Sequence, residues 1–217
     1  MGGVVALAGW YNAASGRAGP AGELGVTNMD HVQFFQAAGT GDVAAVISLI
    51  ERGADPNWIA PQVGHTPLYN ACVSNRPQVV RALIALGANP NLSMNYHSPV
   101  DGRRENGVVA LMFARSPEVV VALVAGGADV NAADEDGLTS LVRAAYWGKR
   151  DVVKALLDAG ADVALKTKSG RSAKDAAASR IEEYRSWAAG PNDEAVAQRI
   201  KVFEDVIQLL ESCLKSD

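Results

Sequence analysis

The apolar positions of this chain follow one arrangement that occurs four times. In each copy, two adjacent apolar residues are followed four positions later by two more, as in Val79, Val80, Leu83 and Ile84. Apolar residues four positions apart lie on one face of an α-helix. The pattern therefore predicts four short amphipathic helices. The other three copies are Ala45, Val46, Leu49 and Ile50; Val119, Val120, Leu123 and Val124; and Val152, Val153, Leu156 and Leu157.

A turn signature follows each predicted helix. The chain continues with Gly-Ala and then Asp or Asn, beginning at Gly53, Gly87, Gly127 and Gly160. Glycine ends a helix because it adopts the left-handed conformation without a Cβ clash, and Asp or Asn favours a turn by bonding to nearby backbone. The first residues of successive signatures are 34, 40 and 33 positions apart. The chain is therefore predicted to consist of repeated units of about this length.

A further short helix is predicted earlier in each unit. Two units open with related segments, 64–68 (Gly-His-Thr-Pro-Leu) and 137–141 (Gly-Leu-Thr-Ser-Leu). Threonine can cap the start of a helix, and proline at the next position loses only an N–H that had no partner there. Each unit is therefore predicted to contain a turn, a short helix, a second short helix and another turn.

These turns and the Thr-Pro-Leu segment resemble the ankyrin repeat family, whose unit of about 33 residues carries a Thr-Pro-Leu-His-x-Ala core. The resemblance covers about Asp30 to Leu214. It implies an all-α ankyrin repeat solenoid, with hairpin tips on one side and first helices that line a concave face. No helix pair can bury its apolar face alone, so neighbouring units supply the core. We expect four units over 30–164 and a degenerate fifth within 165–217.

The third unit departs from the pattern. The tip segment from Asn91 to Gly107 spans 16 residues, whereas Asn131 to Gly137 spans 6, so an insertion of ten residues is predicted within 93–106. We expect it to form a loop that closes outside the helical frame. The Thr-Pro opening is replaced by Val109 and Ala110. The first helix of this unit is therefore expected to be short and less well capped.

The two ends of the chain do not follow the repeat. Residues 1–29 include seven Gly and six Ala, which is typical of a flexible leader, although the apolar part around Trp10 could cover the first unit or contact a partner. At the other end, Asn192 or Asp193 is predicted to cap a helix that packs across the end of the stack. The alternative is that this helix forms a coiled-coil dimer, because the spacing of its apolar residues fits a capping helix and a dimer equally. The apolar residues are Val196, Ile200, Phe203, Ile207, Leu210 and Leu214.

Composition and motifs offer little support for a catalytic, cofactor-binding or nucleic-acid-binding function. The 217 residues carry a formal net charge of −4, so the basic excess of a nucleic-acid domain is missing. No membrane span is predicted, and two cysteines 141 positions apart favour a reducing cytoplasm. No histidine stands at metal-ligand spacing, and no cofactor or catalytic motif occurs. A hydrolase that uses the 93–106 loop, with His97, Asp101, Arg103 and Glu105, is a distant alternative.

The resulting prediction is a non-enzymatic protein–protein interaction module. We expect it to bind one protein partner through its concave face and hairpin tips, and to need no cofactor or metal. Small stand-alone members of the family often inhibit a partner, which favours an inhibitor, immunity or sequestering protein; an adaptor that bridges two proteins is the alternative. Aromatic and Arg side chains are enriched at binding hot spots. The expected partner-binding residues are Trp58, Asn70, Ser74, Tyr96, Arg103, Arg104, Phe113, Arg143, Tyr146 and Trp147.

Overall fold

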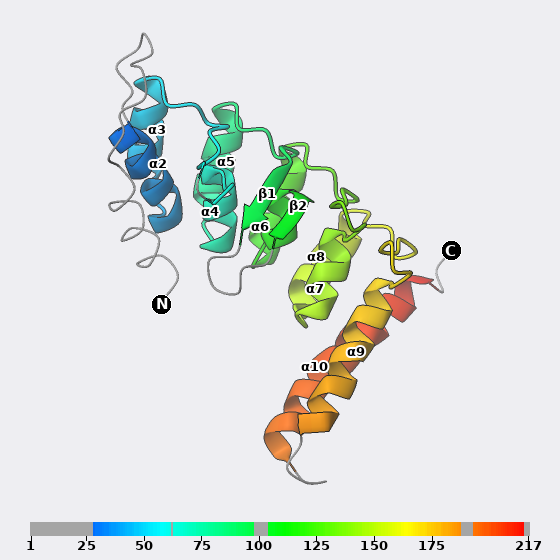
Figure 1. Cartoon of the computed structure of the whole chain (residues 1–217). Coiled ribbons are helices and arrows are strands. Elements are labelled where there is room, and N and C mark those ends of the chain that lie inside the picture. The colour runs from blue at the N-terminus through cyan, green and yellow to red at the C-terminus, as the bar shows by residue number, and fades with distance from the viewer. Residues whose placement is uncertain (1–27, 62, 98–103, 188–192, 215–217) are drawn as a thin grey trace.

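The computed structural model describes residues 28–61, 63–97, 104–187 and 193–214, shown in Figure 1. Residues 1–27 of the predicted leader (1–29) lie outside these ranges, and its last two residues begin α2. The helices of the described structure follow one another in pairs: α2 (Asn28–Thr40) with α3 (Val43–Glu51), α4 (Pro67–Val73) with α5 (Pro77–Ala85), the 3-10 helix η1 (Ala110–Phe113) with α6 (Pro117–Ala125), α7 (Ser140–Tyr146) with α8 (Arg150–Asp158), and α9 (Ala173–Trp187) with α10 (Glu194–Leu214).

These pairs stack in chain order into two rows (Figure 1). The first helices contact one another in the order α2, α4, η1, α7 and α9. The second helices do the same in the order α3, α5, α6, α8 and α10. Each pair therefore buries its apolar faces against its neighbours, and the predicted all-α ankyrin repeat solenoid is confirmed. The boundaries predicted for the segments 1–29, 30–164 and 165–217 stay predictions.

The repeated apolar frame forms the core. Val79, Val80 and Leu83 of α5 are completely buried, and all their equivalents in α3, α6 and α8 are buried except Ala45, which is partly buried. Full burial of one such side chain contributes about 1.5–3 kcal/mol. The periodicity in the sequence therefore identifies the second-helix row correctly. The equivalent buried residues are Val46 and Leu49, Val119, Val120 and Leu123, and Val152, Val153 and Leu156.

Side-chain caps fix where the first helices begin. The hydroxyl of Thr66 accepts from the Tyr69 N–H at 3.0 Å, and Thr139 accepts from the Val142 N–H at 3.3 Å. In the third unit Val109 occupies this position and makes no side-chain cap. The helix that follows is a single 3-10 turn of 4 residues. This confirms the prediction of a short, poorly capped first helix there.

A ladder of asparagines joins the tips of successive units. Asn57 Oδ1 accepts from the Asn89 N–H at 2.7 Å, and Asn57 Nδ2 donates to the Gly87 carbonyl at 3.0 Å. Asn91 repeats both bonds with the Asp129 N–H and the Gly127 carbonyl. Asn131 Oδ1 accepts from the Asp162 N–H at 2.8 Å. The asparagine four residues after the glycine of each of the first three turn signatures therefore sets the spacing to the next unit.

The insertion of the third unit forms a β-hairpin. Strand β1 (Met94–His97) pairs antiparallel with β2 (Arg104–Val108), so that Met94 lies opposite Val108 and Tyr96 opposite Glu105. Met94 and Val108 are 2% and 0% exposed, and the Asn106 carbonyl accepts from the Glu135 N–H of the next tip at 3.0 Å. The expectation of a loop outside the helical frame is wrong, because the base of the hairpin belongs to the core.

The C-terminal pair ends the stack. Asp193 accepts from the Val196 N–H at 3.2 Å, so it caps α10. Helix α10 packs against α9 and α8 through Phe203, Val206 and Leu210, which are buried. This packing agrees with the predicted capping helix, whereas the oligomeric state stays a prediction. Within the described part of the chain, no helix has the length and apolar character needed to cross a bilayer.

Candidate protein-binding surface

The C-terminal ends of three successive first helices present side chains toward solvent. Ser74 follows α4, Phe113 ends η1, and Tyr146 ends α7; all three are half-buried. Trp147, the next residue, is 56% exposed. These residues lie at the C-terminal ends of the first helices in three neighbouring units. The structure therefore brings four of the predicted partner-binding residues onto the first-helix row, while their role in binding stays a prediction.

Asn70 does not belong to this exposed surface. The residue is 6% exposed, and its Nδ2 donates to the Phe35 carbonyl of the preceding unit at 2.7 Å. Gly39 leaves the space for it, since a Cβ at Gly39 would lie 2.6 Å from Asn70 Nδ2. The expectation that Asn70 faces a partner is wrong, because its amide satisfies a backbone carbonyl between two units.

Arg143 is also engaged within the molecule. Its guanidinium forms an ion pair with Glu105 of the β-hairpin and lies over the Phe113 ring, 4.7 Å from the ring centroid. Only 12% of the Arg143 side chain is exposed. The expectation that Arg143 projects freely into the groove is therefore wrong. The hairpin covers it, and sequence spacing carried no signal for a contact between residues 38 positions apart.

The Phe113 ring continues into an aromatic chain toward the second unit. It packs edge-to-face on Tyr69 with a centroid distance of 4.7 Å, and Tyr69 stacks on His65 at 4.1 Å. His65 is 3% exposed, and its burial lowers the pKa of the imidazole from 6.5 to about 4. Histidine in the Thr-Pro-Leu segment is therefore a neutral core residue at physiological pH.

Cationic side chains cap the first helices of preceding units. Arg76 Nε donates to the Gly39 carbonyl at 3.1 Å, and Lys149 Nζ donates to the Ala114 carbonyl at 3.0 Å. Burial lowers the pKa of Lys149 to about 8, with a smaller contribution from the charges of Arg115 and Arg143. A helix C-terminus favours such cations because its last carbonyls lack partners. Sequence reasoning missed these contacts, because their partners are backbone atoms one unit away.

The predicted partner-binding residues at the tips differ in how far their side chains are exposed to solvent. Trp58 is half-buried and stacks on His31 with a centroid distance of 4.8 Å and an interplanar angle of 3°. Arg104 is exposed on β2. Tyr96 lies on β1, and the structure describes its backbone only; Arg103 lies outside the described residues. Among the predicted residues of the hairpin, Arg104 is therefore the one whose side chain the structure shows to be exposed.

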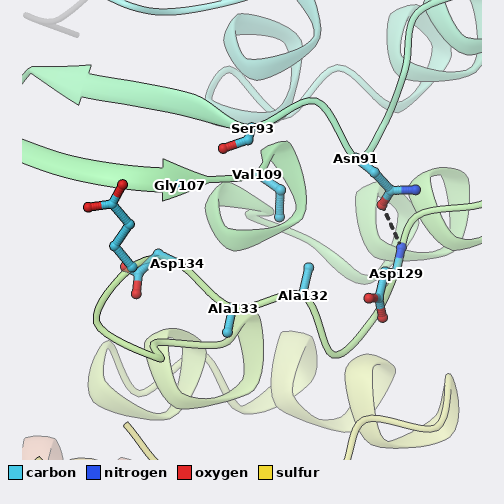
Figure 2. Close-up of a pocket in the computed structure, with 9 residues that line it drawn as sticks. Asn91, Ser93, Gly107, Val109, Asp129, Ala132, Ala133 and Asp134 are labelled. Atoms are coloured by element: carbon cyan, nitrogen blue, oxygen red, sulfur yellow. Dashed lines mark hydrogen bonds between the residues drawn. The ribbon is translucent and has the colours of Figure 1, made fainter. Parts of the chain in front are cut away.

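A surface cleft of about 620 Å³ lies beside the hairpin (Figure 2). Ser93, Gly107 and Val109 form the hairpin side, and the segment 129–135 forms the other side. Asp134 Oδ1 accepts from the N–H groups of Asp136 and Leu138, at 2.9 and 2.8 Å. The carboxylate of Asp134 is thus engaged with the backbone of its own tip. This arrangement is more typical of a protein-binding surface than of a catalytic site.

No group of three or more metal-ligating side chains occurs in the described part of the chain. Glu105, one of the acid–base residues considered for a hydrolase, is committed to its ion pair with Arg143. The stacked units present side chains from their helix ends and tips on a preformed surface. These features define a repeat scaffold of the kind that binds other proteins.

Comparison with known proteins identifies the scaffold. A three-copy ankyrin repeat model matches residues 93–167, and a single ankyrin repeat model matches residues 63–92. The chain is an ankyrin repeat protein and carries a protein–protein interaction module. Proteins of this family are in general non-enzymatic.

Several curated proteins share this region. The mouse B-cell lymphoma 3 protein homolog is 32% identical over 138 residues, which cover 60% of this chain and 29% of that protein. Human ankyrin repeat and SOCS box protein 6 is 31% identical over 147 residues, covering 63% of this chain and 32% of that protein. The mouse 2-5A-dependent ribonuclease is 32% identical over 104 residues, covering 48% of this chain and 13% of that protein. The chain thus spans a third or less of these relatives.

Proposed function

We propose that this chain binds one protein partner through its first-helix row and tips, and that it acts by occupying that partner rather than by catalysis. The observation that carries the proposal is the row of side chains at equivalent helix ends, from Ser74 through Phe113 to Tyr146. The ion pair between Arg143 and Glu105 ties the middle of this row to the β-hairpin. A preformed surface loses little conformational entropy on binding. Inhibition or sequestration of the partner is the role proposed.

The alternative is an adaptor that joins two proteins. The observation that favours it is a second exposed apolar surface at the C-terminal pair, where Trp187 and Val202 are 60% and 40% exposed.

We also propose a reducing compartment such as the cytoplasm. This rests on the two cysteines, since Cys72 and Cys213 are both free thiols.

The experiment is purification of the full chain with its bound proteins from the native source, followed by reconstitution with each purified partner. One stoichiometric partner whose activity falls on binding supports inhibition, whereas two partners that bind together support an adaptor. Turnover of a small substrate by the purified chain would contradict the non-enzymatic proposal.

Variants locate the surface in the same assay. Ser74→Arg places a long side chain in the first-helix row, and Ile59→Asp puts a charge on an apolar tip residue that is 39% exposed. Both should weaken partner binding at least about tenfold, in line with a lost contact of roughly 1.4 kcal/mol or more. Val121→Asp is the matched control, because Val121 is 61% exposed on α6 of the opposite row. Equal loss in the control would place the interface on the second-helix row.

A further inference from the structure

The C-terminal helices extend beyond the rest of the stack and form a corner with the fourth unit (Figure 1). Helices α9 and α10 have 15 and 21 residues, whereas α7 and α8 have 7 and 9. The turn after α7 abuts the side of this extension, because a Cβ at Gly148 would lie 3.0 Å from a Phe203 ring atom. A cavity of about 260 Å³ opens there, which we call the corner pocket; it is lined by Trp147, Arg180, Tyr184, Arg199, Val202 and Phe203 among others.

Large apolar side chains are exposed in and beside the corner pocket. Trp147 is 56% exposed and Val202 40% exposed, and both line the pocket. Trp187, near the end of α9, is 60% exposed and packs its ring edge-to-face on Tyr184, with a centroid distance of 5.5 Å. Clustered exposed apolar groups mark interaction sites, and tryptophan is the residue type most enriched at binding hot spots.

The aromatic rings of the corner pocket already hold a cation. Arg180 lies over three rings, 5.1 Å from the Tyr146 centroid, 5.0 Å from Tyr184 and 5.9 Å from Trp187. Aromatic cages commonly bind cationic ligands. Because Arg180 fills this role from within the chain, a second cation would meet its charge at close range. The pocket therefore disfavours a lysine or arginine of a partner.

Of the two arginines in the corner pocket, Arg199 is the one available to bind an anion. Arg180 pairs with Glu183 and donates to the Tyr184 hydroxyl at 3.3 Å, while its Nε–H finds no acceptor among the described residues. Arg199 is exposed on the pocket rim, and in the described part of the chain no ion pair neutralises it. An exposed guanidinium binds a carboxylate with two parallel hydrogen bonds.

The size of the corner pocket limits what can enter it. Pockets for small-molecule ligands usually measure about 300–1,000 Å³, and the corner pocket is smaller, at about 260 Å³. One large side chain fits such a volume. A nucleic acid strand is disfavoured, because it needs a wide basic stripe, and two arginines of α9, Arg180 and Arg185, are paired with Glu183 and Glu182.

We propose that the corner pocket docks an acidic segment of a protein partner, which inserts one aromatic or long aliphatic side chain against Trp147 and Val202 and pairs a carboxylate with Arg199. The corner pocket shares Tyr146 and Trp147 with the end of the first-helix row, whereas Arg199 and Val202 belong to α10. Binding there is therefore tested at Arg199 and Val202, which the surface proposed for the first-helix row does not include.

The experiment uses the full chain, labelled with ¹⁵N, and a capped heptapeptide with a central phenylalanine between two acidic residues on each side. The indole N–H signals of the four tryptophans are assigned with Trp147→Phe and Trp187→Phe variants. We expect saturable shifts of the Trp147 signal as peptide is added. A peptide with lysines in place of the acids, and one with alanine at the centre, should bind at least about tenfold more weakly.

Variants test the named contacts. Arg199→Glu and Val202→Asp should each lower peptide affinity at least about tenfold, and Arg199→Gln should give an intermediate loss. Arg81→Glu is the matched control, because Arg81 is an exposed arginine on α5, outside the corner pocket. An unfolding curve checks that each variant is folded.

Three results would overturn the proposal. They are no shift of the Trp147 signal at about 1 mM acidic peptide, equal binding of the lysine peptide, and unchanged affinity of Arg199→Glu. Stronger binding of an eight-nucleotide thymidine strand would reassign the corner pocket to single-stranded nucleic acid. Failure here leaves the Ser74→Arg and Ile59→Asp results unaffected, so the two proposals can be judged separately.

Discussion

Polar side chains at single positions hold each unit in register with the next. The asparagines of the tip ladder, the cations at helix ends and Asn70 all reach partners between 30 and 38 residues away along the chain. Most of these partners are backbone groups. A net hydrogen bond of this kind contributes only about 0.5–1.5 kcal/mol, but it fixes the distance between units. Asparagine at 57, 91 and 131 is thus a structural requirement that apolar periodicity does not reveal.

The ladder predicts the cost of removing one asparagine. Asn91→Ala should lower the free energy of unfolding by about 1–2 kcal/mol, because the Asp129 N–H and the Gly127 carbonyl both lose their partner. Denaturant unfolding followed by circular dichroism measures the change. Gln78→Ala, an exposed polar residue on α5, is the control and should stay within about 0.5 kcal/mol of the parent. Equal effects would show that the ladder carries no stability.

His65 predicts how stability depends on pH. Its pKa is about 4 in the folded chain and 6.5 as an ordinary value, so the unfolded chain binds the extra proton as the pH falls below 6.5. His65 therefore costs no stability above pH 6.5 and reduces it progressively down to pH 4, by about 3 kcal/mol in total. Hydrogen bonds with Ser172 lower the pKa of Asp175, so the stability that this carboxylate contributes is also lost in acid.

The contribution of His65 is isolated by difference. The free energy of unfolding of the parent and of His65→Gln is measured from pH 8 to pH 4. Because the carboxylates are common to both proteins, the parent should lose more stability than the variant between pH 6.5 and pH 4. Parallel curves would show that His65 titrates normally in the folded chain.

At the scale of elements, the hairpin and the short helix beside it form one structural unit. Helix η1 has 4 residues where α4 and α7 have 7, and it begins without a side-chain cap. Met94 and Val108 at the base of the hairpin are buried in the same core. Glu105 then ties the hairpin to Arg143 of the next unit. The hairpin thus supplies apolar contacts in the unit whose first helix is shortest.

Met94 tests this role of the hairpin. Met94→Ala should lower the free energy of unfolding by about 2–5 kcal/mol, since a buried side chain is replaced by a cavity. The measurement is denaturant unfolding of the full chain. Val121→Ala, which removes an apolar side chain that is 61% exposed, should change the value by less than about 0.5 kcal/mol. A change for Met94→Ala no larger than the control would place the hairpin outside the cooperative unit.

Sequence reasoning located the helices because their signals are local. Paired apolar residues such as Val152 and Val153 mark a helix face, and the following glycine marks its end. The hairpin lacked such a signal, since its strands are short and carry polar residues between Met94 and Val108. Burial of Asn70 and Arg143 depends on partners in another unit, Phe35 and Glu105. Exposure on the first-helix row could therefore be predicted for Trp147 but not for these two residues.

At the scale of the molecule, the C-terminal pair closes one end of the stack. Helix α10 covers α8 and α9 with Phe203, Val206 and Leu210. Terminal units of a repeat array need a polar outer face to stay soluble. The outward side of α10 provides this with exposed residues such as Lys201, Glu204 and Gln208. We expect the full chain to be monomeric, because Phe203, Val206 and Leu210 of α10 are buried within the chain.

Removal of α10 distinguishes a cap from a dimer seam. Deletion of residues 192–217 should expose the apolar faces of α8 and α9, and cause aggregation or loss of cooperative unfolding. Sedimentation and denaturant unfolding of the full and shortened chains measure both effects. A full chain that sediments as a dimer, with a shortened chain that is a stable monomer, would identify α10 as an oligomerisation element.

The paired gain and loss in the third unit has a consequence for how such chains can diverge. The insertion adds ten residues at the tip, while the first helix of the same unit is three residues shorter than α4 and α7. If the buried hairpin base compensates for the shortened first helix, neither change is tolerated without the other. The insertion and the shortened helix would then be inherited together. A chain that regained a full Thr-Pro helix in this unit would be free to lose the hairpin, and with it the cover over Arg143.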